Sequence, residues 1–527
     1  MDLAKVLPPL PVRRRLLVSV SVWLRRHGRS LAVLVPVLVV AGLAHAIGMS
    51  TFPRYVDDPG TYLSQAWSLR YQGTLSPYSY FYDHAPAGWI QMALWALLTN
   101  GFDRYGTAFG FGNEVMLLAK LASTALVYAL GRRLGFSRAG GAGAALLFAL
   151  CPLSVSYGRW VFLDNLATPW LLGAFVLALS PRRGIAGSLG AALCFGMAAL
   201  TKETALVLLP ALAWAMWRNA DPRNRTQTLT VAAGAGVLLM ALYPLFALYK
   251  GELFPGPGHN SLLGTAGWQL AERPSSGSVL LPDTAARHLF TDWLTQDWIL
   301  LLGGLAALPV CLAAPRLRPI ALALALGWLV LLRGGYVPFM HVLTLLPWAV
   351  LLVVGAIEVV AGNRRPRTWA VEPETPARHP RWRLVMAGGL AIGVLAAAAA
   401  VWPAELRPML TTTEEPPLRA AQRWVADNVP RDKVIVAHDS IWVDLVHHNG
   451  YNPRPIIVHK LDTDPAVRRD LTRIDYLVVP NWYYTAQNGP QGYPTLLEAR
   501  KHAVAVTSFG TGDDGVTVYR VSRYWEP

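Results

Sequence analysis

Two adjacent carboxylates open the most polar stretch of an otherwise largely apolar chain. Asp57 and Asp58 follow the first long apolar run, and the segment 54–89 also carries Asp83, His84 and many aromatic residues. The pair could act as a general base or as metal ligands, and the alternative is a simple solvated turn at the Asp-Pro-Gly sequence. An Asp base is weak, with an unperturbed pKa of ~3.9, but partial burial and a like-charged neighbour raise that value. This stretch is therefore the first place to expect chemistry.

Charged residues recur in two later short loops between apolar runs. Arg159 and Asp164 lie in SYGRWVFLDN, and Lys202 and Glu203 lie in LTKETA. The structural alternatives are an interfacial Arg–Asp pair and a helix start capped by Thr201. The functional reading is phosphate binding, with Arg forming bidentate bonds and Lys acting as a point charge.

The segment YFYDHAP supplies the remaining candidates. His84 sits beside Asp83, although a single histidine in a loop is more often structural than catalytic. Tyr82 could stack on a sugar ring, and it could equally belong to the aromatic belt of a membrane interface. Lys120 is the one cation inside an apolar run, where it either faces a polar interior or extends to the surface.

The composition indicates a membrane protein. Of 527 residues, 53% are hydrophobic and only 15% are charged, whereas soluble chains carry about 25% charged residues. The net charge of +15 does not indicate nucleic-acid binding, because the basic residues lie in short clusters between apolar runs. The three cysteines show neither a disulfide framework nor metal-ligand spacing.

Hydropathy predicts about eleven transmembrane helices with the N-terminus in the cytoplasm. With that orientation every inner loop is basic, as the positive-inside rule requires, and everything after residue 402 lies outside. The first outer loop, 50–112, contains two segments expected to lie on the membrane, 60–73 and 87–99; the alternative is that 87–99 spans it. The predicted spans are 31–49, 113–131, 139–157, 166–180, 184–200, 203–217, 228–249, 297–314, 319–334, 338–361 and 384–402.

Residues 403–527 change character and predict a second domain. Charge rises, the apolar runs shorten, and strands alternate with helices, which is typical of a small α/β domain with a partly parallel sheet. No Gly-rich phosphate fingerprint follows its first strand, so dinucleotide binding is not supported. The expected strands are 434–439, 455–460, 475–480, 503–509 and 517–522. The division is thus a transmembrane domain, 1–402, and an extracytoplasmic α/β domain, 403–527.

The outer-loop motifs, taken in order, resemble those of the GT-C membrane glycosyltransferases. YFYDHAPAGW, GRWVFLDN and LTKE look like the loops of protein O-mannosyltransferase-like and aminoarabinose-transferase-like enzymes, which depend on a phospholipid carrier. The resemblance implies that Asp57 is the base with Asp58 as its neighbour, and that Arg159 and Lys202 bind the lipid phosphate. Relatives often have Lys-Pro-Pro where this chain has His84-Ala85-Pro86, which leaves the role of His84 open.

The resemblance also implies an activity and its partners. The enzyme would move a sugar, with inversion, from a polyprenyl-phosphate donor to a hydroxyl of a glycan, lipid or protein at the outer face of the plasma membrane. Neither the resemblance nor the residues name a cofactor, and a divalent metal ion stays open. The competing classes are a transporter or flippase of lipid-linked precursors and a non-catalytic component of envelope assembly. For the enzyme, we expect Asp57, Asp164, Arg159 and Lys202 to converge on one outward-facing cavity.

Overall fold

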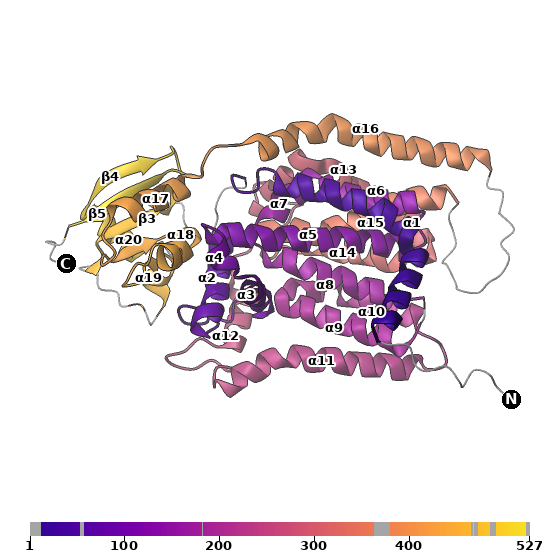
Figure 1. The fold of residues 1–527 in the computed structure, drawn as a ribbon, viewed down its shortest axis with the longest axis horizontal. Coiled ribbons are helices and arrows are strands. Elements are labelled where there is room, and N and C mark those ends of the chain that lie inside the picture. The colour runs from indigo at the N-terminus through magenta and orange to yellow at the C-terminus, as the bar shows by residue number, and fades with distance from the viewer. Residues whose placement is uncertain are drawn as a thin grey trace.

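Most of the chain forms one bundle of helices, with a β-sheet region packed against one end (Figure 1). The computed structural model describes residues 12–52, 57–181, 183–362, 380–464, 467, 473–484 and 492–522; the side chains of residues 12–26 and of Asp57 are not described.

Seven helices in the described part of the chain are long and apolar enough to cross a membrane, and a bent pair makes an eighth. The chain is thus a multi-pass membrane protein. In the bent pair, Pro152 begins the second helix and lacks the N–H that would continue the first, and the two axes differ by 57°. The spans lie in α1 (Val12–Ala46), α5 (Ala108–Arg133), α11 (Arg225–Tyr249), α13 (Ala285–Ala313), α14 (Arg318–Leu332) with the preceding 3-10 turn η4 (Pro315–Leu317), α15 (Val342–Val360) with the preceding 3-10 turn η5 (Phe339–His341), and α16 (Arg381–Thr411), with α6 (Arg138–Leu150) and α7 (Pro152–Arg159) as the pair.

The prediction of about eleven spans is therefore only partly matched. Three further predicted spans correspond to shorter helices that run alongside the others in the bundle (Figure 1). A 16-residue helix is about 24 Å long, against a hydrocarbon layer of about 30 Å. These helices are α8 (Leu163–Ala178), α9 (Ile185–Thr201) and α10 (Leu209–Asn219), the last preceded by the 3-10 turn η2 (Glu203–Leu208).

Helix α13 starts earlier than hydropathy predicts. It begins at Ala285 rather than at residue 297, and its backbone leaves helical geometry at Asp297. The predicted span thus matches the apolar part after the break, whereas the sequence before the break is too polar to predict a span. The rest of that loop contains α12 (Leu262–Gly267) and the π-helical turn η3 (Trp268–Glu272).

Two helices cross the end of the bundle instead of running along it. Helix α2 (Asp57–Gln72) lies across the bundle axis and α3 (Ala87–Thr99) is seen end-on beside it (Figure 1). They match the predicted surface helices, and α3 has too few residues to span. A short helix, α4 (Gly101–Arg104), connects them to α5.

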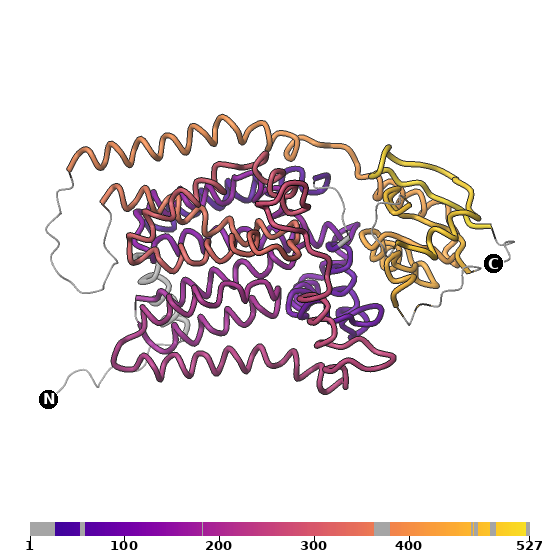
Figure 2. The backbone as a smooth tube through the Cα atoms, turned by 180° about the vertical axis from the view of Figure 1, so that it is seen from behind, coloured from indigo at the N-terminus to yellow at the C-terminus, as the bar shows by residue number. Residues whose placement is uncertain are grey.

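Helices α11 and α16 lie on opposite outer edges of the bundle, as both views show (Figure 2). Their outward side chains are apolar yet exposed: Leu238 is 71% exposed and Val385 is 73% exposed. Such surfaces are stable when they face lipid rather than water.

The C-terminal region contains a five-stranded mixed sheet in the order β2-β1-β3-β5-β4. β1 pairs in parallel with β2 and β3, whereas β5 is antiparallel to β3 and β4. The partly parallel sheet predicted from the sequence is confirmed, although α16 continues past residue 402 to Thr411. The elements are α17 (Pro417–Asn428), β1 (Ile435–Ala437), α18 (Asp439–Val443), η6 (Asp444–His448), β2 (Ile456–Ile457), α19 (Lys460–Thr463), β3 (Tyr476–Pro480), η8 (Asn481–Tyr484), α20 (Pro494–Lys501), β4 (Ala503–Phe509) and β5 (Val516–Val521).

The C-terminal region is docked tightly on α2. A Cβ added to Gly60 would lie 2.3 Å from the backbone nitrogen of Ser440, so only glycine permits this approach. Trp442 is fully buried and packs edge-on against Trp67, and it belongs to the same apolar cluster as Tyr62 and Trp89 of the bundle end.

Candidate active site

Lys202 and Asp164 lie together where the ends of two packed helices meet. Lys202 ends α9, and Asp164 lies in the first turn of α8, with 3.9 Å between Nζ and Oδ2. Their side chains are only 6% and 5% exposed. Because a buried charge is costly unless it is paired, the two stabilise each other here.

His84 joins this pair to Glu203. Its Nε2 lies 3.2 Å from Lys202 Nζ, and its Nδ1 lies 3.0 Å from Glu203 Oε2. With an ammonium on one side, Nε2 is the acceptor and Nδ1–H donates to the carboxylate. The result is a continuous row of four side chains from three chain segments, which runs from Glu203 through His84 and Lys202 to Asp164.

Glu203 is held as a carboxylate at the turn between α9 and η2. Burial raises its pKa, but His84, Lys202 and the backbone N–H of Ala85 outweigh burial, so the net pKa lies below its usual range. The Ala85 N–H donates to the second carboxylate oxygen. Glu203 therefore fixes both the ring and the backbone of the residues around position 84.

Several tyrosines hold the segment that carries His84. Tyr80 donates to the carbonyl of His84 at 2.5 Å, and Tyr243 of α11 donates to the same oxygen at 3.1 Å. Tyr82, with a φ of 57°, turns away and donates to Glu252 at 2.5 Å. Tyr82 thus anchors the segment to the end of α11. The sequence does not distinguish Tyr80 and Tyr243 from its many other tyrosines.

The phenol of Tyr62, in α2, lies near several carboxylates of the region. Its ring lies 6.0 Å from the His84 ring and stacks on Trp89. Burial raises the pKa of Tyr62 well above its ordinary value, and the nearby carboxylates raise it further. These carboxylates belong to Asp58, Asp83, Asp164 and Glu203. The structure thus brings the predicted acids of the first outer loop close to those of the later loops.

The structure describes the side chain of only one member of the acid pair that the sequence predicts as the base. Asp57 begins α2, and its side chain is not among those described. Asp58, in the same first turn, is half-buried, and its negative charge raises the pKa of Tyr62. Within the described side chains, no group of three His, Cys, Asp or Glu residues has the arrangement of a metal site.

Arg159 has other partners than those expected. The Arg159 residue is 1% exposed, and its guanidinium donates to the carbonyls of Met409, Ala44 and Ile47 at 2.6–2.8 Å. These carbonyls lie at the C-terminal ends of α16 and α1, where arginine commonly satisfies unpaired acceptors. The guanidinium is thus occupied at two helix ends and is not in the row with Lys202.

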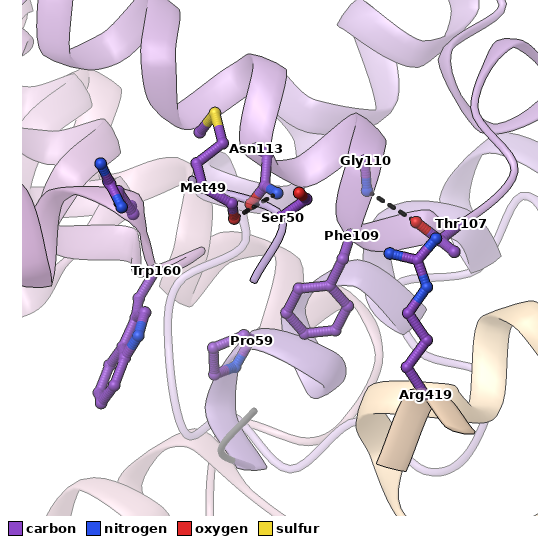
Figure 3. Close-up of a pocket in the computed structure, with 10 residues that line it drawn as sticks. Met49, Ser50, Pro59, Thr107, Phe109, Gly110, Asn113, Trp160 and Arg419 are labelled. Atoms are coloured by element: carbon purple, nitrogen blue, oxygen red, sulfur yellow. Dashed lines mark hydrogen bonds between the residues drawn. The ribbon is translucent and has the colours of Figure 1, made fainter. Parts of the chain in front are cut away.

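Arg159 and Lys202 line different cavities, so the structure does not bring Arg159 together with Lys202 in the way that the sequence predicts. One cavity, of about 40 Å³, lies between the ends of α1, α2, α5 and α7, with Arg419 of α17 reaching in from the C-terminal region (Figure 3). The other, of about 20 Å³, has Asp164 and Lys202 in its wall. The sequence could not show this separation, because it depends on where the ends of α1 and α16 meet. The first cavity is lined by Met49, Ser50, Pro59, Thr107, Phe109, Gly110, Asn113, Arg159, Trp160 and Arg419.

Comparison with known proteins gives a match over part of the sequence. Residues 84–246 match the family model described as dolichyl-phosphate-mannose-protein mannosyltransferase, which covers less than a third of the chain. This segment contains His84, Asp164, Lys202 and Glu203. No curated protein sequence matches the chain.

Solved structures match almost the whole chain at low identity. ArnT from Cupriavidus metallidurans in the apo state gives a TM-score of 0.56 at 13% identity, covering 95% of this chain and 99% of that one. The same protein bound to undecaprenyl phosphate gives 0.54 at 14%, covering 94% and 98%. The oligosaccharyltransferase of Archaeoglobus fulgidus, tethered with an acceptor peptide containing the NVT sequon, gives 0.54 at 13%, covering 95% and 75%. The chain therefore has the fold of the GT-C membrane glycosyltransferases, the fold that its outer-loop motifs predict.

Proposed function

We propose that this protein is a glycosyltransferase that moves a sugar from a polyprenyl-phosphate donor to an acceptor hydroxyl at the outer face of the membrane. The observation that carries the proposal is the Lys202 ammonium, buried at the end of α9 beside Asp164 and His84. The mannosyltransferase match over 84–246 and the ArnT-like fold support it.

Lys202 is the proposed ligand of the donor phosphate. Its cavity is otherwise walled mostly by apolar side chains of α8 and α15, including Leu171, Leu343 and Trp348, which suit a prenyl chain. A volume of about 20 Å³ holds little more than a water molecule. A phosphate must therefore widen the site, and it competes with Asp164 for the ammonium. The ArnT structure bound to undecaprenyl phosphate makes a lipid of this class the first donor to test.

The chemistry needs a base and a stabilised leaving group. The leaving phosphate is a weakly basic anion, so positive charge from Lys202 replaces a general acid. Asp57, with Asp58 beside it in the first turn of α2, is the proposed base that takes the proton from the acceptor hydroxyl. Attack opposite to the departing phosphate inverts the anomeric carbon.

The proposed membrane topology of the protein is the one that the loop charges predict. Eleven helices cross the membrane, including the shorter α8, α9 and α10, with the N-terminus in the cytoplasm and the C-terminal region outside. The transmembrane domain then extends to the end of α16, and the C-terminal region forms a second domain after residue 411.

The test is transfer by the purified protein from a panel of polyprenyl-phosphate sugars, followed by mass spectrometry of lipid and acceptor products. Lys202→Met should reduce transfer about 100-fold, because one charged group at the leaving oxygen is removed. Asp57→Asn should abolish transfer while the lipid still binds. Lys250→Met, at an exposed lysine after α11, is the matched control and should change neither.

Three outcomes would contradict the proposal. Full transfer by Asp57→Asn would remove Asp57 from the base role, and full transfer by Lys202→Met would remove Lys202 from the phosphate. Movement of intact lipid-linked sugar across vesicles without transfer would favour the transporter or flippase class.

A further inference from the structure

The segment 78–84, which carries His84, lies between the bundle and the C-terminal region. It has neither helical nor strand structure, and its residues are held from both sides. The bundle side holds Tyr80, Tyr82 and His84 through the contacts described above. The other side contacts Tyr78, Ser79 and the ring of Phe81.

The C-terminal region contacts the segment through four partly buried hydrogen bonds. Tyr78 donates to the carbonyl of Pro455 at 2.9 Å and accepts from the N–H of Ile457 at 3.1 Å. Ser79 donates twice to Asp464, from its backbone N–H and from its hydroxyl, each at 3.0 Å. The Asp464 residue is 2% exposed. These bonds fix the backbone just before the active-site residues.

Lys460 adds an electrostatic contact to the same segment. Its ammonium lies 3.4 Å from the centre of the Phe81 ring, a cation–π geometry. Burial lowers the pKa of Lys460 to about 8, while Asp83 and Asp464 oppose that shift. Asp83 is the direct neighbour of His84, so Lys460 acts close to the row of charged side chains.

We infer that Asp464 and Lys460 are positioning residues of the donor site, through which the C-terminal region holds His84 against Lys202 and Glu203. An irregular segment that is held on one side only retains backbone freedom, and this freedom would let the His84 ring move away from Lys202 and Glu203. The inference rests on the proposed function only for its kinetic readout.

The experiment compares two aspartates that each accept two hydrogen bonds at the same interface. Asp464 accepts two bonds from Ser79 of the segment, whereas Asp103 of α4 accepts from Tyr71 at 2.9 Å and His447 at 3.0 Å. Asp464→Ala should speed amide hydrogen exchange in peptides 78–86 and 200–206 by about tenfold. It should also lower kcat about tenfold with KM for the lipid changed less than about twofold. Asp103→Ala should leave exchange in both peptides and kcat unchanged.

A second variant keeps the test decisive if Asp464→Ala fails to fold. Ser79→Ala removes one of the two bonds to Asp464 from the opposite side and should reproduce the exchange increase in part. Unchanged exchange in peptide 200–206 in both Asp464→Ala and Ser79→Ala would overturn the inference, as would an equal effect of Asp103→Ala. If the wild-type protein transfers no sugar, the proposed function fails, while the exchange comparison still decides the positioning role.

Discussion

At the scale of single residues, the chain gathers its candidate chemistry from three loops. Glu203, His84, Lys202 and Asp164 form one connected row, and Tyr62 lies among the carboxylates of Asp58, Asp83, Asp164 and Glu203. Much of this set could be identified from the sequence, because its members lie in the polar segment 54–89 and in two short loops that the charge pattern predicts to face the same side. Arg159 is the exception, since residue type cannot tell a phosphate ligand from a cation that satisfies helix-end carbonyls.

Arg159 should therefore matter for stability more than for donor binding. Arg159→Met removes the donor from three backbone carbonyls, that of Met409 in a buried bond, and we expect a loss of about 3 kcal/mol in the free energy of unfolding. The measurement is the thermal unfolding midpoint in detergent, with KM for the polyprenyl-phosphate sugar determined in parallel. Normal stability together with a strongly raised KM would instead support the phosphate role.

At the scale of elements, hydropathy period and length predict most helices and all five strands of the C-terminal sheet. The errors have physical causes. α8 and α9 are apolar but short, and the early part of α13 is too polar to be recognised before the break at Asp297. The docking of the C-terminal region on α2 could not be predicted, because it depends on the meeting of Gly60 with Ser440, which lie far apart in the chain.

That close approach makes Gly60 the most sensitive position of α2. A Cβ at Gly60 would lie 2.3–2.6 Å from backbone atoms of residues 439 and 440, which cannot move as a flexible side chain could. We expect Gly60→Ala to cost about 1–3 kcal/mol in the free energy of unfolding. Gly106→Ala is the control, because a Cβ there meets no atom within 4 Å. Equal unfolding midpoints for the two variants would contradict this account of the interface.

At the scale of the whole molecule, the bundle and the C-terminal region share buried surface rather than a flexible tether. One apolar cluster contains Trp89 of α3, Trp67 of α2 and Trp442 of α18. Between the two parts, Lys460 of the C-terminal region lies over the Phe81 ring, and burial lowers its pKa to about 8 from its ordinary 10.5. Docking of the two parts therefore has a titratable group at its edge.

The sign of the pH dependence follows from proton binding. Between about pH 8 and pH 10.5 the unfolded chain keeps a proton at Lys460 that the folded protein has released, so stability rises with pH in this window. Lys460→Met should remove that rise, measured as the difference in unfolding midpoint from wild type across pH 7–11. Lys501→Met, at a lysine side chain 68% exposed, should run parallel to wild type. A constant difference between Lys460→Met and wild type would show that Lys460 does not titrate in this window.

The three carbonyls held by Arg159 also bear on how the protein is made. Ala44 and Ile47 precede Arg159 in the chain, but Met409 follows it by 250 residues. During synthesis, this guanidinium has two of its acceptors early and obtains the third only when the last long helix has left the ribosome. Arg159 therefore completes its hydrogen bonds only when α16 packs against the bundle. A chain that ends before α16 leaves the Arg159 guanidinium without its bond to Met409.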